Sequence, residues 1–112
     1  MGDEVRPWGR YEVLSESSDH KVKRIIVNAG ARFSYQCHRH RSEHWFIISG
    51  QAKITHNGVE FTMGAGDSID IAQGDLHRLA SIGNESVVFI EVQSGSYFGE
   101  DDIERIEDDY NR

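Results

Sequence analysis

The chain has 112 residues, of which 38% are apolar and 28% are charged, and its net charge is −7 at neutral pH. This length predicts one domain, residues 1–112, built around a single hydrophobic core. The negative charge argues against an extended nucleic-acid interface, and no apolar run is long enough to cross a membrane.

The only cysteine, Cys37, cannot form an intrachain disulfide, which is typical of a protein from a reducing compartment. The N-terminal sequence MGDEVRPWG has no apolar signal-peptide region, so we expect a cytoplasmic location. Cys37 lies between Gln36 and His38. A strand that turns these two side chains inward would turn Cys37 outward, and we interpret it as a packing residue.

Short segments rich in β-branched and aromatic residues follow one another along the chain, separated by turn residues. Asn57-Gly58 is the sharpest turn, because both residues accept the positive φ of a type I′ hairpin. This spacing predicts an all-β sandwich or barrel. The predicted strands are Gly9–Leu14, Lys21–Val27, Arg32–His38, Glu43–Ile48, Ala52–His56, Val59–Met63, Ser68–Ile71, His77–Ile82 and Val87–Gln93.

The C-terminal segment GEDDIERIEDDYNR is the one stretch with helical character. Ile103 and Ile106 lie three residues apart among charged residues, as on one face of a helix. We therefore expect a short irregular or helical tail that packs through these two isoleucines.

The segment GARFSYQCHRHRSEHWFIISG concentrates possible metal ligands. Gln36 and His38 are two residues apart and would share one face of a strand. Glu43 follows a turn and would return from an antiparallel neighbour, and His77 opens a later strand. Two imidazoles, one carboxylate and one amide oxygen would then meet in the barrel mouth. A divalent cation held by this set keeps a net positive charge, as a Lewis acid requires.

His40 offers an alternative, because it shares its strand face with His38. A rival metal site therefore consists of His38, His40, Glu43 and His77. His44 would point away from Glu43, since adjacent residues in a strand face opposite sides.

The spacing of these residues resembles the two motifs of the cupin family. The first motif is a glycine, five residues, a ligand, one residue, a histidine, three or four residues, a glutamate, six residues and a glycine. It matches Gly30, Gln36, His38, Glu43 and Gly50. The second motif matches Gly66, Gly74 and His77, with Ala72 in place of its proline and Ser81 in place of its last asparagine.

A Gln-x-His pair with a glutamate and a later histidine is similar to the metal set of phosphomannose isomerases. The segments RPWGRYEVL, GDLHRL and IEVQSGSYFGEDDIERIEDDYNR also resemble the type II phosphomannose isomerase cupin, often found at the C-terminus of mannose-1-phosphate guanylyltransferases. The resemblance extends from Arg6 to Arg112. It implies a cupin double-stranded β-helix, a jelly-roll barrel, that interconverts mannose 6-phosphate and fructose 6-phosphate. Guanylyl transfer is not expected, because this chain contains no nucleotidyltransferase domain.

The resemblance also implies a cofactor and site residues. The cofactor is a divalent metal, zinc or alternatively Mn, Co, Ni or Fe, held by Gln36, His38, Glu43 and His77. Arg105 is the first choice for binding the phosphate or the enediolate, with an ion pair to a neighbouring carboxylate as its structural alternative. Glu100 is a candidate base, as are Asp101 and Asp102, unless they form only a solvated acidic segment. Lys23 is a third candidate catalytic residue, because the alternation of its strand could place its side chain in the cavity.

Two other functions stay open at this point. One is a non-catalytic cupin that binds a sugar or a sugar phosphate. The other is a metal oxygenase, because two histidines and a carboxylate suit iron, although Gln36 and the flanking segments favour the isomerase. Cupin relatives are commonly dimers, and the apolar segment Val87–Val92 would allow a homodimer if it formed a sheet edge.

Overall fold

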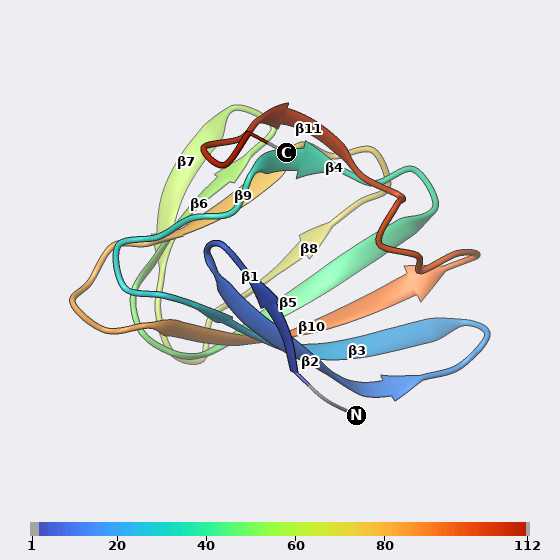
Figure 1. The fold of residues 1–112 in the computed structure, drawn as a ribbon, viewed down its shortest axis with the longest axis horizontal. Coiled ribbons are helices and arrows are strands. Elements are labelled where there is room, and N and C mark those ends of the chain that lie inside the picture. Colours follow the sequence, from blue (N-terminus) through green and yellow to red (C-terminus); the bar gives the residue numbers. More distant parts are fainter. Residues whose placement is uncertain (1–2, 112) are drawn as a thin grey trace.

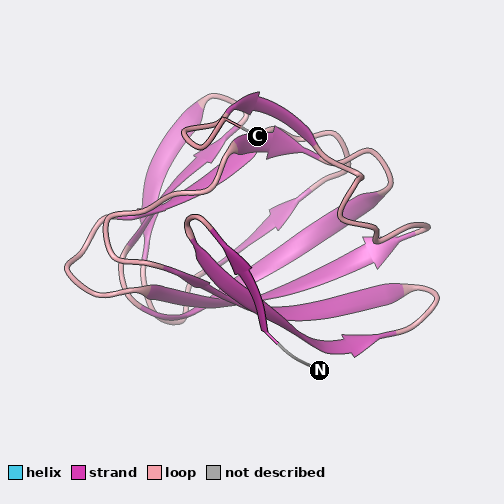
Figure 2. Ribbon diagram, in the orientation of Figure 1, coloured by secondary structure: helices cyan, strands magenta, loops and turns pink. Residues whose placement is uncertain are grey.

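The computed structural model describes residues 3–111, and all regular secondary structure in this range is β-strand (Figures 1 and 2). The strands are β1 (Asp3–Arg6), β2 (Gly9–Glu16), β3 (His20–Val27), β4 (Tyr35–Cys37), β5 (Arg41–Ser49), β6 (Ala52–His56), β7 (Val59–Met63), β8 (Ser68–Ile71), β9 (His77–Ser81), β10 (Val87–Gly95) and β11 (Glu104–Glu107). No helix able to span a lipid bilayer occurs within residues 3–111.

The strands form two antiparallel sheets that face each other (Figure 1). The larger sheet has the order β1-β2-β3-β10-β5-β8, and the smaller sheet has the order β11-β4-β9-β6-β7. Side chains from both sheets fill the space between them, and among the fully buried ones are Trp45, Ile54, Leu79 and Phe89. The predicted all-β barrel of antiparallel strands is confirmed.

Local signals placed several strands correctly. β6, β7 and β8 have the predicted bounds, and the turn between β6 and β7 has positive φ at both Asn57 (48°) and Gly58 (83°). The predicted strand Arg32–His38 is shorter, since only Tyr35–Cys37 pairs continuously and Arg32 makes a single bridge to Ala80. Side chains instead bind the backbone before this strand: the Tyr110 hydroxyl donates to the carbonyl oxygen of Arg32 and the Arg78 guanidinium to that of Phe33, contacts that β-propensity does not reveal.

The expectation of a helical tail is wrong. Residues Glu104–Glu107 form β11, which pairs with β4 at the edge of the smaller sheet. An open strand edge offers backbone hydrogen bonds that a side-chain periodicity cannot anticipate. Ile103 is half-buried, whereas Ile106 is 54% exposed, so only the first isoleucine packs as expected.

Strand β10 is not an edge strand, contrary to the expectation for Val87–Val92. It pairs with β3 on one side and with β5 on the other. Its inward-facing side chains change in character along the strand, from Val87 and Phe89 to Glu91 and Gln93. Lys21 and Lys23 on β3 lie opposite the last two. One end of the barrel interior is therefore an apolar core, and the other end carries buried charged groups.

Candidate metal centre

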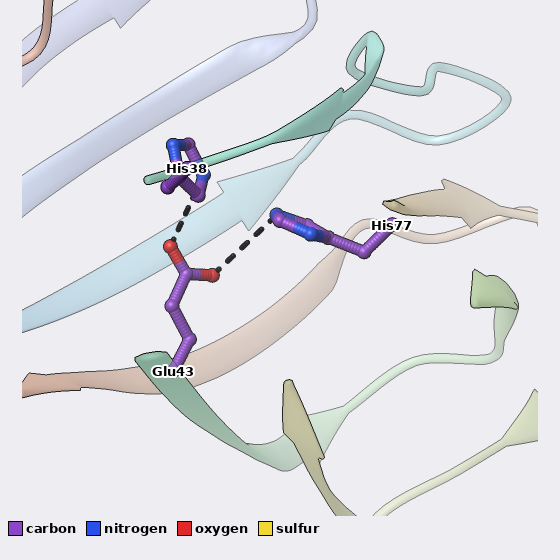
Figure 3. Close-up of side chains that lie close together, drawn as sticks. All are labelled: His38, Glu43 and His77. Carbon is purple, nitrogen blue, oxygen red and sulfur yellow. Dashed lines mark ion pairs between the residues drawn. The ribbon is translucent and has the colours of Figure 1, made fainter. Parts of the chain in front are cut away.

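The candidate metal ligands lie at the polar end of the barrel and come from both sheets (Figure 3). His77 is the first residue of β9, and His38 directly follows β4, the strand paired with β9. Glu43 lies on β5 in the facing sheet, not on a strand beside β4 as predicted. The ligand atoms of the three residues all lie within 4.8 Å of one another. The predicted convergence of these three side chains is thus present, but it occurs across the barrel.

The orientation of each histidine is set by a backbone carbonyl. Nδ1 of His38 lies 2.6 Å from the carbonyl oxygen of Asp102, and Nδ1 of His77 lies 2.9 Å from that of Asp75. A carbonyl oxygen only accepts hydrogen bonds, so both Nδ1 atoms carry the proton. Each Nε2 then presents a lone pair, and these atoms lie 3.3 Å (His38) and 3.7 Å (His77) from the carboxylate oxygens of Glu43 (Figure 3).

These lone pairs fit a cation. Burial lowers the pKa of His38 to about 4 and also lowers the pKa of His77, so both rings are neutral at pH 7. The buried Nε2 of His77 has no hydrogen-bond partner among residues 3–111, although it faces a carboxylate. A lone pair directed at an anionic oxygen is repelled, and a divalent cation between them would satisfy both. The residues present therefore suit a bound metal.

Glu43 is held as a carboxylate. Its complete burial works to raise its pKa, but the positive charges that His77 and His38 carry at acid pH and the permanent charge of the Arg41 guanidinium outweigh burial, so the pKa lies below its ordinary value. Two donors from its own strand orient the carboxylate: Nε of Arg41 at 3.0 Å and Nε1 of Trp45 at 2.9 Å. The third ligand is thus ionised and rigidly placed.

Gln36 lies beside this cluster, where its Nε2 is 3.4 Å from Nε2 of His38. Its Oε1 accepts a hydrogen bond from the Ser34 hydroxyl at 2.5 Å. A half-turn of the amide would bring Oε1 next to His38, and Ser34 could accept from the amide instead, since a hydroxyl both donates and accepts. The role of Gln36 as a fourth ligand stays a prediction.

The neighbouring residues His40, His44 and Cys37 point elsewhere. The side chain of His40 is 56% exposed, and its Nδ1 lies 3.2 Å from a carboxylate oxygen of Asp102. His40 is therefore outside the cluster of His38, Glu43 and His77, and the rival site that includes it is not formed. His44 is exposed and its Nδ1 lies 2.6 Å from Asp70, as expected for a residue that faces away from Glu43. Cys37 is half-buried, with Sγ 3.9 Å from Glu104.

A cavity of about 110 Å³, partly open to solvent, adjoins the cluster and is lined by Gln36 and His38. The predicted residues Lys23, Glu100 and Arg105 all lie in its wall. The side chains that line it include four basic residues, two acidic residues and a set of apolar or aromatic residues: Arg6, Lys23, Arg41 and Arg105; Glu91 and Glu100; Trp8, Tyr11, Ile25, Phe33 and Ile103. The structure therefore joins the histidine–glutamate cluster to a cavity rich in cations.

Lys23 and Glu100 form the closest ion pair in this wall. Lys23 is buried, with 3% of its surface exposed. Its Nζ lies 2.7 Å from Oε2 of Glu100 and 4.0 Å from the centre of the Tyr11 ring. Partial burial works to raise the pKa of Glu100, but Lys23 outweighs it, so the pKa lies below its ordinary value. The inward direction predicted for Lys23 is confirmed, and its charge is matched by a partner.

Two buried polar residues, Glu91 and Gln93, were not predicted. Burial, followed by the charge of Glu43, raises the pKa of Glu91 above its ordinary range, and its carboxylate accepts a 2.5 Å hydrogen bond from the Gln93 amide. Alternation along β10 contained the signal, because both residues share a face with the core residues Val87 and Phe89.

The sequence matches a family model described as "Mannose-6-phosphate isomerase C-terminal" over residues 2–108. The chain belongs to this family. Its relatives include the "Alginate biosynthesis protein AlgA" of Pseudomonas aeruginosa, which is 48% identical over 107 residues, 96% of this chain. The "Mannose-1-phosphate guanylyltransferase" of Klebsiella pneumoniae is 45% identical over the same length. The chain spans only 22% and 23% of these two relatives, so it is homologous to one part of each.

Solved structures of low sequence identity share the fold. The capsular polysaccharide assembling protein CapF from Staphylococcus aureus has a TM-score of 0.83 at 19% identity, covering 94% of this chain and 34% of CapF. A double-stranded β-helix protein from Klebsiella pneumoniae has a TM-score of 0.80 at 24% identity, covering 93% of this chain and 89% of that protein. These similarities establish the cupin fold and carry no further argument about function.

Proposed function

We propose that this protein is a metal-dependent mannose-6-phosphate isomerase, which interconverts mannose 6-phosphate and fructose 6-phosphate. The observation that carries the proposal is the cavity whose wall holds four basic side chains together with His38, the member of the His38–Glu43–His77 cluster that reaches it. A sugar phosphate needs both features, because its phosphate requires cations and its enediol intermediate requires stabilisation of a negative oxygen. The family match supports the same substrate class.

The phosphate is assigned to Arg105. This residue lies on β11 at the rim of the cavity, where its side chain is exposed and its backbone pairs with Gln36. A guanidinium binds two phosphate oxygens at once, so a rim arginine can hold the phosphate while the carbon chain extends inward. The reacting carbons of the sugar would then lie near His38 and Glu43.

The reaction moves one proton between neighbouring carbons. In the forward direction a base removes the proton from C2 of mannose 6-phosphate, O1 gains a proton as the enediol forms, C1 then receives a proton, and O2 loses one. Glu100 is proposed as this base, because it is ionised, lines the cavity and is oriented by Lys23. A divalent cation held by His38, Glu43 and His77, with Gln36 as a fourth ligand, would stabilise the developing negative oxygen.

The identity of the cation is proposed to be zinc, with Mn, Co, Ni or Fe as alternatives, since imidazole and carboxylate ligands suit all of them. The decisive experiment measures conversion of mannose 6-phosphate to fructose 6-phosphate by the purified chain with each metal, beside the His77→Ala variant. We expect turnover that requires His77. Measurable binding of the sugar phosphate without turnover by any metal form would instead identify a non-catalytic sugar-phosphate cupin.

The expected homodimer also remains a proposal. Phe46, Ile48 and Val92 are exposed on β5 and β10 of the larger sheet, on the side opposite the buried core residues of these strands. Exposed apolar side chains of this kind favour association with another surface. Sedimentation equilibrium of the purified chain tests it.

A further inference from the structure

The connection from β10 to β11 passes from the larger sheet to the smaller one (Figure 1). Residue Asp102 lies in this connection and is 8% exposed. Its two carboxylate oxygens accept hydrogen bonds from the backbone N–H groups of Arg39 and His40, each at 3.0 Å. Asp102 therefore holds the turn that directly follows the ligand His38.

The main chain of the same residue contacts the ligand itself. The carbonyl oxygen of Asp102 accepts the Nδ1 proton of His38 at 2.6 Å. This hydrogen bond directs the Nε2 lone pair of His38 toward Glu43. The carboxylate of Asp102 thus binds the turn that follows His38, and its carbonyl oxygen binds the His38 ring.

The second histidine is held differently. The carbonyl that accepts the Nδ1 proton of His77 belongs to Asp75, only two residues earlier in the chain. The partner of His38 lies 64 residues away in the sequence. The tautomer of His77 is consequently fixed by a local turn, whereas that of His38 depends on how the distant connection is anchored.

We infer that Asp102 is a positioning residue for the metal ligand His38: its carboxylate fixes the connection so that its carbonyl selects the Nδ1–H tautomer. The Nε2 atom then keeps the lone pair that a cation requires, which in this structure accepts a hydrogen bond from the Arg41 guanidinium at 3.2 Å. The two ring nitrogens of a histidine side chain are distinct, and the hydrogen bond made by one of them decides which carries the proton, so His38 needs such a partner. The inference rests on the metal centre of the proposed function. It concerns a residue that does not itself touch the cation.

The test compares Asp102→Ala with Asp101→Ala, because Asp101 is an exposed neighbour whose carboxylate accepts a hydrogen bond from the Tyr97 hydroxyl. The first readout is the imidazole ¹⁵N spectrum of the metal-free protein, with His38 identified by the His38→Gln variant. We expect the Nδ1–H tautomer of His38 to be lost in Asp102→Ala and kept in Asp101→Ala. His77 should keep its tautomer in both variants and serves as an internal reference.

The second readout is the affinity for Zn²⁺, measured by competition with a chromophoric chelator. We expect a 10- to 100-fold weaker Kd for Asp102→Ala, roughly the loss seen when a partner of a ligating histidine is removed, and an unchanged Kd for Asp101→Ala. If Asp102→Ala does not fold, Asp102→Asn is judged by the same readouts, because it keeps one oxygen acceptor and should give a smaller change. An Nδ1–H tautomer and a Kd that both survive removal of the carboxylate would overturn the inference. If the unmodified protein bound no Zn²⁺, the proposed function would fail, and the tautomer spectrum would still decide the role of Asp102.

Discussion

Trp45 donates its indole N–H to the carboxylate of Glu43 across 2.9 Å, two residues back along β5. The same indole is fully buried and packs edge-on against Phe33 and at 5.5 Å against the ring of His77. One side chain therefore belongs both to the hydrophobic core and to the environment of two candidate ligands. The apolar and polar ends of the barrel meet at this residue.

Replacing Trp45 by Phe should affect both stability and metal binding. The variant loses volume and leaves an oxygen of the buried carboxylate without its donor, which should lower the free energy of unfolding by about 3 kcal/mol. Urea denaturation in the presence of a chelator measures this loss, and a Zn²⁺ titration should show weaker binding. Phe89→Leu is the matched control, because Phe89 packs on Trp45 and its phenyl ring has no donor for Glu43. It should lose stability and keep its Zn²⁺ affinity.

His77→Ala should weaken binding of a divalent metal roughly 100-fold, since one of three converging ligand atoms is removed; this corresponds to about 3 kcal/mol of binding free energy. Metal analysis after dialysis and calorimetric titration measure the change. His44→Ala is the control, because His44 is exposed, lies 2.6 Å from Asp70 and is outside the cluster. Equal metal content in the two variants would contradict the assigned ligand set.

Glu100→Gln should lower kcat at least 100-fold while metal content stays unchanged, because a carboxamide has the shape of the carboxylate but cannot accept the substrate proton. Steady-state kinetics with mannose 6-phosphate measure this effect. Asp101→Asn, a change of the same kind at the exposed neighbouring position, should keep kcat within about twofold. A Glu100→Gln enzyme with normal kcat would remove Glu100 as the base.

The two glycines that bracket the first motif should differ in their tolerance of a side chain. At Gly50 (φ +89°) an added Cβ would lie 2.5 Å from the carbonyl oxygen of Ser86, whereas at Gly30 (φ +77°) it would meet nothing within 4 Å. Gly30→Ala therefore costs only the strain of positive φ, about 1 kcal/mol, while Gly50→Ala adds a backbone clash and should cost about 3 kcal/mol or more. Thermal or urea unfolding of the two variants tests this order.

Alkali should destabilise the fold through Tyr11. Burial, and then the charge of Glu100, raises the pKa of Tyr11 from its ordinary 10.0 to about 12. The folded state thus holds this proton more tightly than the unfolded state, so the contribution to stability is complete below pH 10 and is lost as the pH rises toward 12. The near-ultraviolet tyrosinate absorbance should show a late phase, and Tyr11→Phe should abolish it.

Much of the site was predictable because its signals are local. The Asn57-Gly58 turn fixed the bounds of β6 and β7, and the spacing of His38, Glu43 and His77 was sufficient to predict that they meet. The separation of His40 from the cluster was not predictable from local signals. It depends on the contact of Asp102 with the turn after β4, which leaves His40 exposed and separates it from the cluster.

The sequence by itself determined the all-β class, the hairpin between β6 and β7 and the set of ligating residue types, since alternation, turn chemistry and residue spacing act over a few neighbours. Tertiary structure alone decided that Glu43 approaches from the facing sheet, that residues 104–107 pair as a strand, and that Lys23 meets Glu100. Each of these depends on hydrogen bonds or charges that lie far apart along the chain. Their free energy is gained only when the two sheets have closed around the polar end of the barrel.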